Sequence, residues 1–330
     1  MNQSAVICCR TPRPCPEQAY GGVWRGPGAA PSSPWRAPVP SCFRFATAAS
    51  RAGAPERCGS KKLDSTRALA ESGRMSTVHF VGGEKGGVGK SVVARLLAQL
   101  FIERNLAFAA LDADLSHGAL MRYYADYSRA VDLTQLDSAD QIMDAALASD
   151  RRVLVDLPAQ SHRFLRRWVD TADVLSYAQE MGVRLVFWHV TDGGYDSVSH
   201  LEQLLSLLGT AVQCVVVKNQ GRSHDFTQFD ASPAQRRLLE LGGQVATLPE
   251  LDAAAMYKID RFGSSFWAAI HAQEGERALS PMERRRAKLW LERAHQALDQ
   301  VGEWQSSAER RFVSSESQAE PVPAPALISN

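Results

Sequence analysis

The sequence predicts an α/β protein with a doubly wound, mostly parallel sheet flanked by helices, and a helical C-terminal part. Three observations support this prediction. Short apolar runs alternate with segments of helical periodicity, two of those runs end on aspartate, and a glycine-rich loop joins the first run to the first helix. Strands that alternate with helices build parallel β-α-β units, and ligands of such sheets bind beyond the carboxyl ends of the strands.

The first strand is expected at 77–82, and the first helix from Gly89 to about Arg104. Between them lies the sequence VGGEKGGVGKS, beginning at Val81. A strict G-x-x-x-x-G-K-[ST] pattern does not match, because Glu84 stands at the position of the first glycine. A strand before such a loop and a helix after it is the context in which glycine-rich loops bind phosphate.

The next strands are expected to end near the same place. The apolar run 107–111 leads into Asp112-Ala113-Asp114, and the strand 152–156 ends on Asp156 after a helix at roughly 138–149. Buried parallel strands show continuous apolar runs of this kind, so the acids should gather at one edge of the sheet. Two further strands are expected at 183–190 and 212–218.

The segment 232–300 is predicted to be largely helical, with interruptions near Gly263 and Gly275. Its last helix, about 281–300, has an apolar face that we expect to pack against the sheet or a partner subunit. That face consists of Ala287, Leu291, Ala294, Leu298 and Val301. Membrane contact is the less favoured alternative, because acidic residues interrupt the face and no apolar run approaches a membrane span.

Composition divides the chain into a basic front and an acidic body. Residues 1–74 hold 11 of the 37 basic and 4 of the 36 acidic residues, which leaves 26 basic and 32 acidic residues in the remainder. The front also holds five of the six cysteines and nine of the sixteen prolines, without periodicity. We expect 1–74 to be disordered or a mis-assigned extension before Met75, 75–302 to form the domain, and 303–330 to be a disordered tail.

The body retains only Cys214, which favours a reducing cytoplasm as the location. The segment 1–74 lacks the long apolar stretch of a secretory signal. Its prolines also disfavour the amphipathic helix of a transit peptide.

The glycine-rich loop has the chemistry of a phosphate site. Its backbone N–H groups should surround phosphate oxygens, the Lys90 ammonium should face the terminal phosphates, and the Ser91 hydroxyl should ligate Mg²⁺. The helix that follows adds its positive dipole end. The cofactor-binding residues predicted from the loop and the start of the helix are Gly86, Gly87, Val88, Gly89, Lys90, Ser91 and Val92.

KGGVGKS resembles the deviant Walker A loop of the ParA/MinD superfamily of P-loop ATPases, and the resemblance runs from about Thr77 onward. It implies ATP and Mg²⁺ as cofactors and a homodimer that forms on ATP binding. By this resemblance Lys85 reaches the partner's phosphates, so Lys85, Lys90 and Asp114 form the predicted catalytic set.

The resemblance also assigns the acids and one amide. Asp114 orients the attacking water, Asp112 supports Mg²⁺ or Lys85, and Asp156 is the Walker B acid, which makes Ser91, Asp112 and Asp156 the predicted metal set. Asn219 takes the position of the family's adenine-reading asparagine. Phosphoryl transfer needs such positioned charges more than covalent chemistry.

A second resemblance points to a branch of this superfamily. The segments Gln179–Gly182, His189–Gly194 and Leu248–Leu251 are similar to those of the ParA-like ATPases of plasmid conjugal transfer and mobilisation, of the TraL, MobD and StbB type. It covers most of residues 77–300. It implies a slowly hydrolysing dimer switch in plasmid mobilisation, transfer or partition, with a DNA-bound adaptor or relaxosome protein as partner.

The chain also departs from the family pattern. Leu115-Ser116-His117 replaces the usual proline–glutamine continuation, and only 42 positions separate Asp114 from Asp156. The region that forms the switch is therefore reduced, so direct DNA binding stays open. Two alternatives remain: an ATP-dependent ligase of the CobQ/dethiobiotin-synthetase type, against which Lys85 argues, and an interaction module that binds ATP without turnover.

Overall fold

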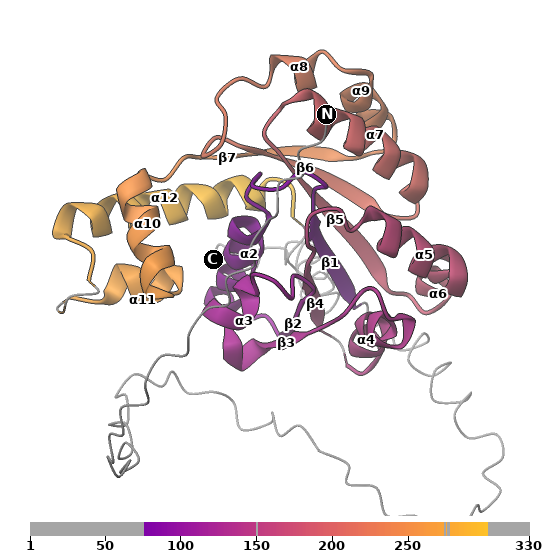
Figure 1. Ribbon diagram of the computed structural model, residues 1–330, viewed down its shortest axis with the longest axis horizontal. Coiled ribbons are helices and arrows are strands. Elements are labelled where there is room, and N and C mark those ends of the chain that lie inside the picture. Colours follow the sequence, from indigo (N-terminus) through magenta and orange to yellow (C-terminus); the bar gives the residue numbers. More distant parts are fainter. Residues whose placement is uncertain (1–75, 150, 274, 276–277, 303–330) are drawn as a thin grey trace, which may run out of the picture. The chain divides into compact units, whose positions relative to one another are not determined.

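The computed structural model describes residues 76–149, 151–273, 275 and 278–302. The predictions for residues 1–74 and 303–330 therefore fall outside the described residues. Those residues that are described form a sheet with helices on both faces (Figure 1).

All seven strands of the sheet run parallel, in the order β3-β2-β4-β1-β5-β6-β7. Their bounds are β1 Thr77–Gly82, β2 Phe108–Asp112, β3 Ser128–Ala130, β4 Arg152–Asp156, β5 Arg184–Thr191, β6 Gln213–Asn219 and β7 Gln244–Leu248. The chain winds from β1 toward β3 on one side and continues from β4 to β5 on the other. The strand order therefore reverses beside β1, which is the place where doubly wound sheets bind ligands.

Helices cover both faces of the sheet (Figure 1). One face carries α2 (Lys90–Glu103), α3 (Ala119–Tyr123), α10 (Ala253–Phe262), α11 (Phe266–His271) and α12 (Pro281–Asp299). The other carries α4 (Leu136–Leu147), α5 (His162–Ala172), α6 (Val174–Glu180), α7 (Tyr195–Leu208), α8 (Thr227–Asp230) and α9 (Pro233–Glu240). The short helix η1 spans Ala125–Tyr127.

The central strands are buried on both sides, which explains why most of their residues are apolar. In β1, Val78 and Phe80 belong to the apolar cluster under α4–α9, whereas Val81 belongs to the cluster under α2 and α10–α12. This alternation follows from the two-residue period of a strand. The predicted fold class is confirmed, and the predicted strands at 77–82 and 152–156 agree with β1 and β4.

The segment 232–300 is largely helical, as predicted, and it also contains β7, a strand that the sequence did not predict. This strand is short and partly exposed, and it pairs only with β6 at the edge of the sheet. Its pattern is therefore weaker than that of a central strand. The other edge strand, β3, was also not predicted and has only three residues, Ser128–Ala130.

The last predicted helix is α12, and its apolar face is buried. It contacts α2, α11 and β7, which confirms the expectation that this face packs against the sheet. Ser280 caps the helix in a reciprocal pair with Glu283, and Pro281 occupies its first turn. Among the described helices, none is long and apolar enough to cross a membrane.

Candidate functional site

The glycine-rich loop connects β1 to α2 and leaves open space over its middle. A Cβ atom added at Gly86 or Gly87 would meet no atom within 4 Å. At Gly89 the φ angle is +102°, and an added Cβ would lie 2.2 Å from Asn219 Nδ2. The loop is thus packed tightly where it enters α2 and is open where phosphates are expected to bind.

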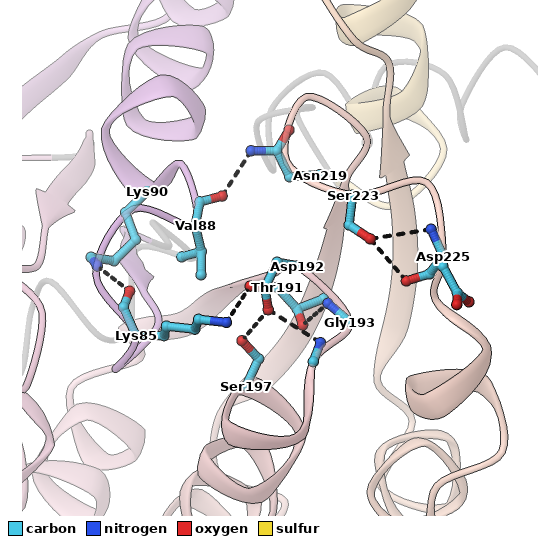
Figure 2. Close-up of polar contacts among 11 residues, drawn as sticks. Lys85, Val88, Lys90, Thr191, Asp192, Gly193, Ser197, Asn219, Ser223 and Asp225 are labelled. Atoms are coloured by element: carbon cyan, nitrogen blue, oxygen red, sulfur yellow. Dashed lines mark hydrogen bonds and ion pairs between the residues drawn. The ribbon is translucent and has the colours of Figure 1, made fainter.

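Lys90 is the first residue of α2, and its side chain lies over the loop (Figure 2). Its Nζ donates a hydrogen bond to the carbonyl of Lys85, 3.1 Å away. Burial lowers the pKa of Lys90, while the charges of Asp156, Asp114 and Glu84 act in the opposite direction. A buried ammonium that donates to one carbonyl among the described residues is well suited to bind an anionic ligand.

Asp112 and Asp156 end neighbouring strands and lie opposite each other in the β2–β4 register. The sequence prediction that these acids gather at one sheet edge is confirmed. Asp156 is completely buried, and neither carboxylate oxygen has a hydrogen-bond partner of good geometry in the described part of the chain. Burial, with the charge of Asp112, raises the pKa of Asp156 to about 8, although the Ser91 hydroxyl and Lys90 act to lower it.

An unpaired buried carboxylate is costly unless a cation or a proton neutralises it. The residues present therefore fit a magnesium ion, which Ser91 and Asp156 would hold. No cluster of three histidine, cysteine or acidic side chains that could hold a metal occurs in the described ranges. Mg²⁺ sites that use one or two carboxylates are usually completed by phosphate oxygens and water.

Asp112 and Asp114 make different contacts. Asp112 is buried, and its carboxylate accepts hydrogen bonds from the backbone N–H groups of Met121 (3.0 Å) and Asp114 (3.2 Å). Asp114 caps the following turn by accepting from the N–H groups of Ser116 and His117, at 3.2 and 3.1 Å. Burial raises the pKa of Asp112, and these backbone bonds oppose the rise.

Asn219 is the last residue of β6, and its side chain braces the loop (Figure 2). Its Nδ2 donates to the carbonyl of Val88 at 2.8 Å, and its Oδ1 accepts from the N–H of Gly221 at 3.1 Å. The structure thus places Asn219 beside the loop and gives its amide a structural contact there. Its role in reading adenine stays a prediction.

The sequence did not predict the partner of Lys85. Lys85 Nζ pairs with Asp192 Oδ2 at 2.5 Å (Figure 2), and the hydrogen bond and charge of Asp192 raise the pKa of Lys85. Asp192 Oδ1 is held in turn by Ser197 Oγ (2.7 Å) and the N–H of Gly194 (3.2 Å). Asp192 directly follows β5, so the rule that located Asp112 and Asp156 would also have found it.

Glu84 was also assigned no role from the sequence. Its carboxylate accepts a hydrogen bond from the backbone N–H of His162, 2.8 Å away, at the start of α5. The residue at the missing-glycine position therefore links the loop to the segment that follows Asp156.

The class of protein is defined by three features: the central strand β1, the loop into α2, and the acids at the ends of β2 and β4. The chain has a ParA/MinD-like P-loop NTPase fold. No protein-family model matches the sequence.

Within this class the chain is similar to two kinds of curated protein and to one solved structure, among others. It is 25% identical over 180 residues to Protein MobD of Acidithiobacillus ferrooxidans, covering 53% of this chain and 78% of that protein. It is 27% identical over 192 residues to Protein TraL of Escherichia coli, covering 53% and 79%. The MinD cell division protein of Aquifex aeolicus matches at 12% identity with a TM-score of 0.40, covering 76% of this chain and all (100%) of that one.

Proposed function

We propose that this protein binds and slowly hydrolyses Mg-ATP and acts as a nucleotide-dependent dimer switch. We further propose that it serves plasmid DNA mobilisation, conjugal transfer or partition. The observation that carries the proposal is the unpaired, buried Asp156 beside an open glycine loop and a buried Lys90. A buried carboxylate favours a bound cation and a buried ammonium favours a bound anion, and Mg-ATP would supply both.

Each residue of the site has a proposed role. The backbone of Gly86–Gly89 and the Lys90 ammonium bind the phosphates, and Asn219 holds the loop by its bond to Val88. Ser91 and Asp156 would hold Mg²⁺, with Asp112 in a supporting role, and the ion would neutralise charge on the phosphates. Asp114 orients the attacking water.

The dimer is inferred from Lys85, whose side chain is 38% exposed beside the loop. Reaching a partner's phosphates requires Lys85 to exchange its pairing with Asp192 for a phosphate. Both pairings are ionic, so the exchange replaces one charge contact with another. The similarity to MobD and TraL supports the plasmid role, and a DNA-bound adaptor or relaxosome protein is the proposed partner.

A second candidate function, ATP binding without turnover, is favoured by one observation. The Asp114 carboxylate already accepts two backbone hydrogen bonds from its own turn, which restrains it from meeting a water. In this case the protein would signal through binding alone.

The test measures ATP binding and phosphate release with the purified full-length chain. We expect Lys90→Ala to abolish ATP binding, because no other buried cation of the described site faces the loop, and Asp114→Ala to bind ATP without hydrolysing it. Normal ATP turnover in Lys90→Ala would contradict the assignment of this loop as the nucleotide site. If wild type and Asp114→Ala both bind ATP tightly and neither hydrolyses it measurably, the protein is instead a module that binds ATP without turnover.

A salt-dependent gel shift with and without ATP tests the nucleic-acid partner. The body of the chain is acidic, so we expect direct DNA binding to be weak and strongly salt-dependent, and an adaptor protein to be required. Tight ATP-dependent binding by the protein alone would contradict the adaptor proposal.

A further inference from the structure

Position 84 distinguishes this loop from the strict phosphate-loop pattern, which has glycine there. Glu84 is not among the residues with positive φ, so its backbone does not require glycine. The side chain is partly buried and is directed toward a segment 78 residues away in sequence. The glutamate therefore makes a contact that glycine could not make.

Hydrogen bonds tie the segment after Asp156 to β1 and the loop. Leu157 N donates to Val81 O at 2.9 Å, which extends the β1–β4 pairing by one residue. Gln160 N donates to Glu84 O at 3.2 Å, and His162 N donates to Glu84 Oε1 at 2.8 Å. Glu84 thus contacts this segment with both its backbone and its side chain.

Helix α5 depends on this contact because its own residues do not cap it. The residue before the helix, Ser161, makes no side-chain capping bond, and the first turn contains no acidic residue. The first N–H groups of a helix have no intrahelical partner, and a carboxylate near them is favoured by the helix dipole. Glu84 supplies that carboxylate from outside the helix.

The same segment contains local strain and lies beside a small cavity. Gln160 has a φ of +58°, an uncommon value for a residue with a side chain, and its N–H is held by Glu84 O. Behind the contact is a small cavity with room for roughly one water molecule. It is lined in part by Glu84, His162, His189 and His200. Hydrogen bonds therefore hold the segment where side-chain packing is incomplete.

We propose that Glu84 is a positioning residue that clamps the segment 157–162 to the phosphate loop, so that ligand-induced movement of the loop is transmitted to Asp156 and α5. The clamp rests on the proposed nucleotide-binding function. It acts close to Asp156, because Leu157 is the next residue in the chain. Glu84 also lies near Lys90, since its charge helps to raise the pKa of that lysine.

Three substitutions separate the components of the clamp. Glu84→Gln keeps an oxygen acceptor and removes the charge, whereas Glu84→Ala removes the acceptor. Glu84→Gly also removes it, and at the same time restores the strict G-x-x-x-x-G-K-S pattern. Glu180→Ala, on the exposed end of α6, is the matched control.

The first measurement is hydrogen–deuterium exchange of the full-length protein without nucleotide. We expect the His162 amide to exchange about tenfold faster in Glu84→Gly and Glu84→Ala, the change that follows from losing one charge-assisted hydrogen bond. Glu84→Gln should stay within about threefold of wild type, and Glu180→Ala should not differ from it. Unchanged exchange in Glu84→Gly would overturn the clamp.

The second measurement repeats the exchange with Mg-ADP and adds turnover of Mg-ATP. In wild type, Mg-ADP should change the exchange rates of the amides across 157–165. In Glu84→Gly this change should be at least about threefold smaller. For Mg-ATP turnover by Glu84→Gly, kcat should be roughly tenfold below that of wild type, and KM should stay within about threefold of it. Rescue by Glu84→Gln would support positioning. Wild-type response and kcat in Glu84→Gly would refute it, whereas a wild-type chain that binds no nucleotide would refute the proposed function, and the coupling with it.

Discussion

At the scale of the residue, Asp156 has the most unusual environment in the site. Its folded-state pKa of about 8 lies far above the ordinary value of 3.8, because the carboxyl group is buried. Between these values the folded protein retains a proton that the unfolded chain releases. The contribution of Asp156 to the free energy of unfolding is therefore fully present below about pH 4 and is lost as the pH rises toward about 8.

Asp156→Asn should remove this pH dependence, because asparagine does not titrate. The measurement is denaturant unfolding with a chelator present. Between pH 5 and pH 8 the free energy of unfolding of wild type should fall by on the order of a few kcal/mol more than that of the variant. Identical pH slopes in the two proteins would show that Asp156 is ionised in the folded state without a cation.

Lys85 and Asp192 give a second prediction at this scale. Asp192→Asn should release Lys85 and lower the ATP concentration needed for dimerisation by about two- to fivefold, the range expected for an exposed ion pair. Asp196→Asn is the control, since the charge of Asp196 also raises the pKa of Lys85, whereas Lys85 donates its hydrogen bond to Asp192. Lys85→Ala should bind ATP as a monomer and fail to dimerise.

Analytical ultracentrifugation with ATP measures these outcomes. A dimer in Lys85→Ala equal to that of wild type would remove the role of Lys85 across the interface. Equal effects of Asp192→Asn and Asp196→Asn would show that general charge, not the specific pair, restrains Lys85.

At the scale of the element, the loop between β1 and α2 has a closed end and an open middle. Gly86→Ala should fold normally, because open space surrounds the added methyl group, and should impair ATP binding where the phosphates pass. Gly89→Ala should destabilise the fold by roughly 1–3 kcal/mol, because a positive φ and a clash with Asn219 both oppose it.

Thermal unfolding and ATP binding distinguish the two variants. The expected pattern is a normal melting temperature with poor binding for Gly86→Ala, and a lowered melting temperature for Gly89→Ala. If Gly86→Ala binds ATP like wild type, the phosphates do not occupy the middle of the loop.

At the scale of the whole molecule, one buried arginine joins the loop helix to the C-terminal helices. The side chain of Arg95 in α2 is 3% exposed. Its Nη1 pairs with Asp260 Oδ1 of α10 at 2.6 Å, and its Cζ lies 3.7 Å from the ring centroid of Tyr123 in α3. Tyr123 also donates to the carbonyl of Asp260. The three helices therefore share one polar contact on this face of the sheet.

Asp260→Ala should destabilise the protein by about 1–3 kcal/mol, because it leaves Arg95 buried without its ionic partner. Asp170→Ala breaks the exposed pair with Arg166 and should change stability by less than about 0.5 kcal/mol. Denaturant unfolding measures both. Equal effects would mean that Arg95 is stabilised by its aromatic neighbours alone.

Particular elements show how far the sequence could predict the molecule. Strand β4 has a continuous apolar run and β1 an apolar run interrupted only by His79, and both have clear ends, so their bounds were predicted correctly. Strand β7 was missed because its five residues are partly exposed and follow a helical segment. In the site, too, local patterns were predictable and distant contacts were not. Asp112 and Asp156 were predicted because they end strands, whereas the contacts of Glu84 and Lys85 join residues that are 78 and 107 positions apart.

The sequence alone determined the fold class, the loop and the gathering of Asp112 and Asp156 at one sheet edge. These features follow from local patterns, namely apolar periodicity, glycine spacing and residues that end strands. Only the tertiary structure decided that Lys85 pairs with Asp192, that Glu84 caps α5 and that Asn219 braces the loop. Such contacts depend on which elements the winding of the sheet brings together, because a hydrogen bond requires its two groups to lie within about 3 Å.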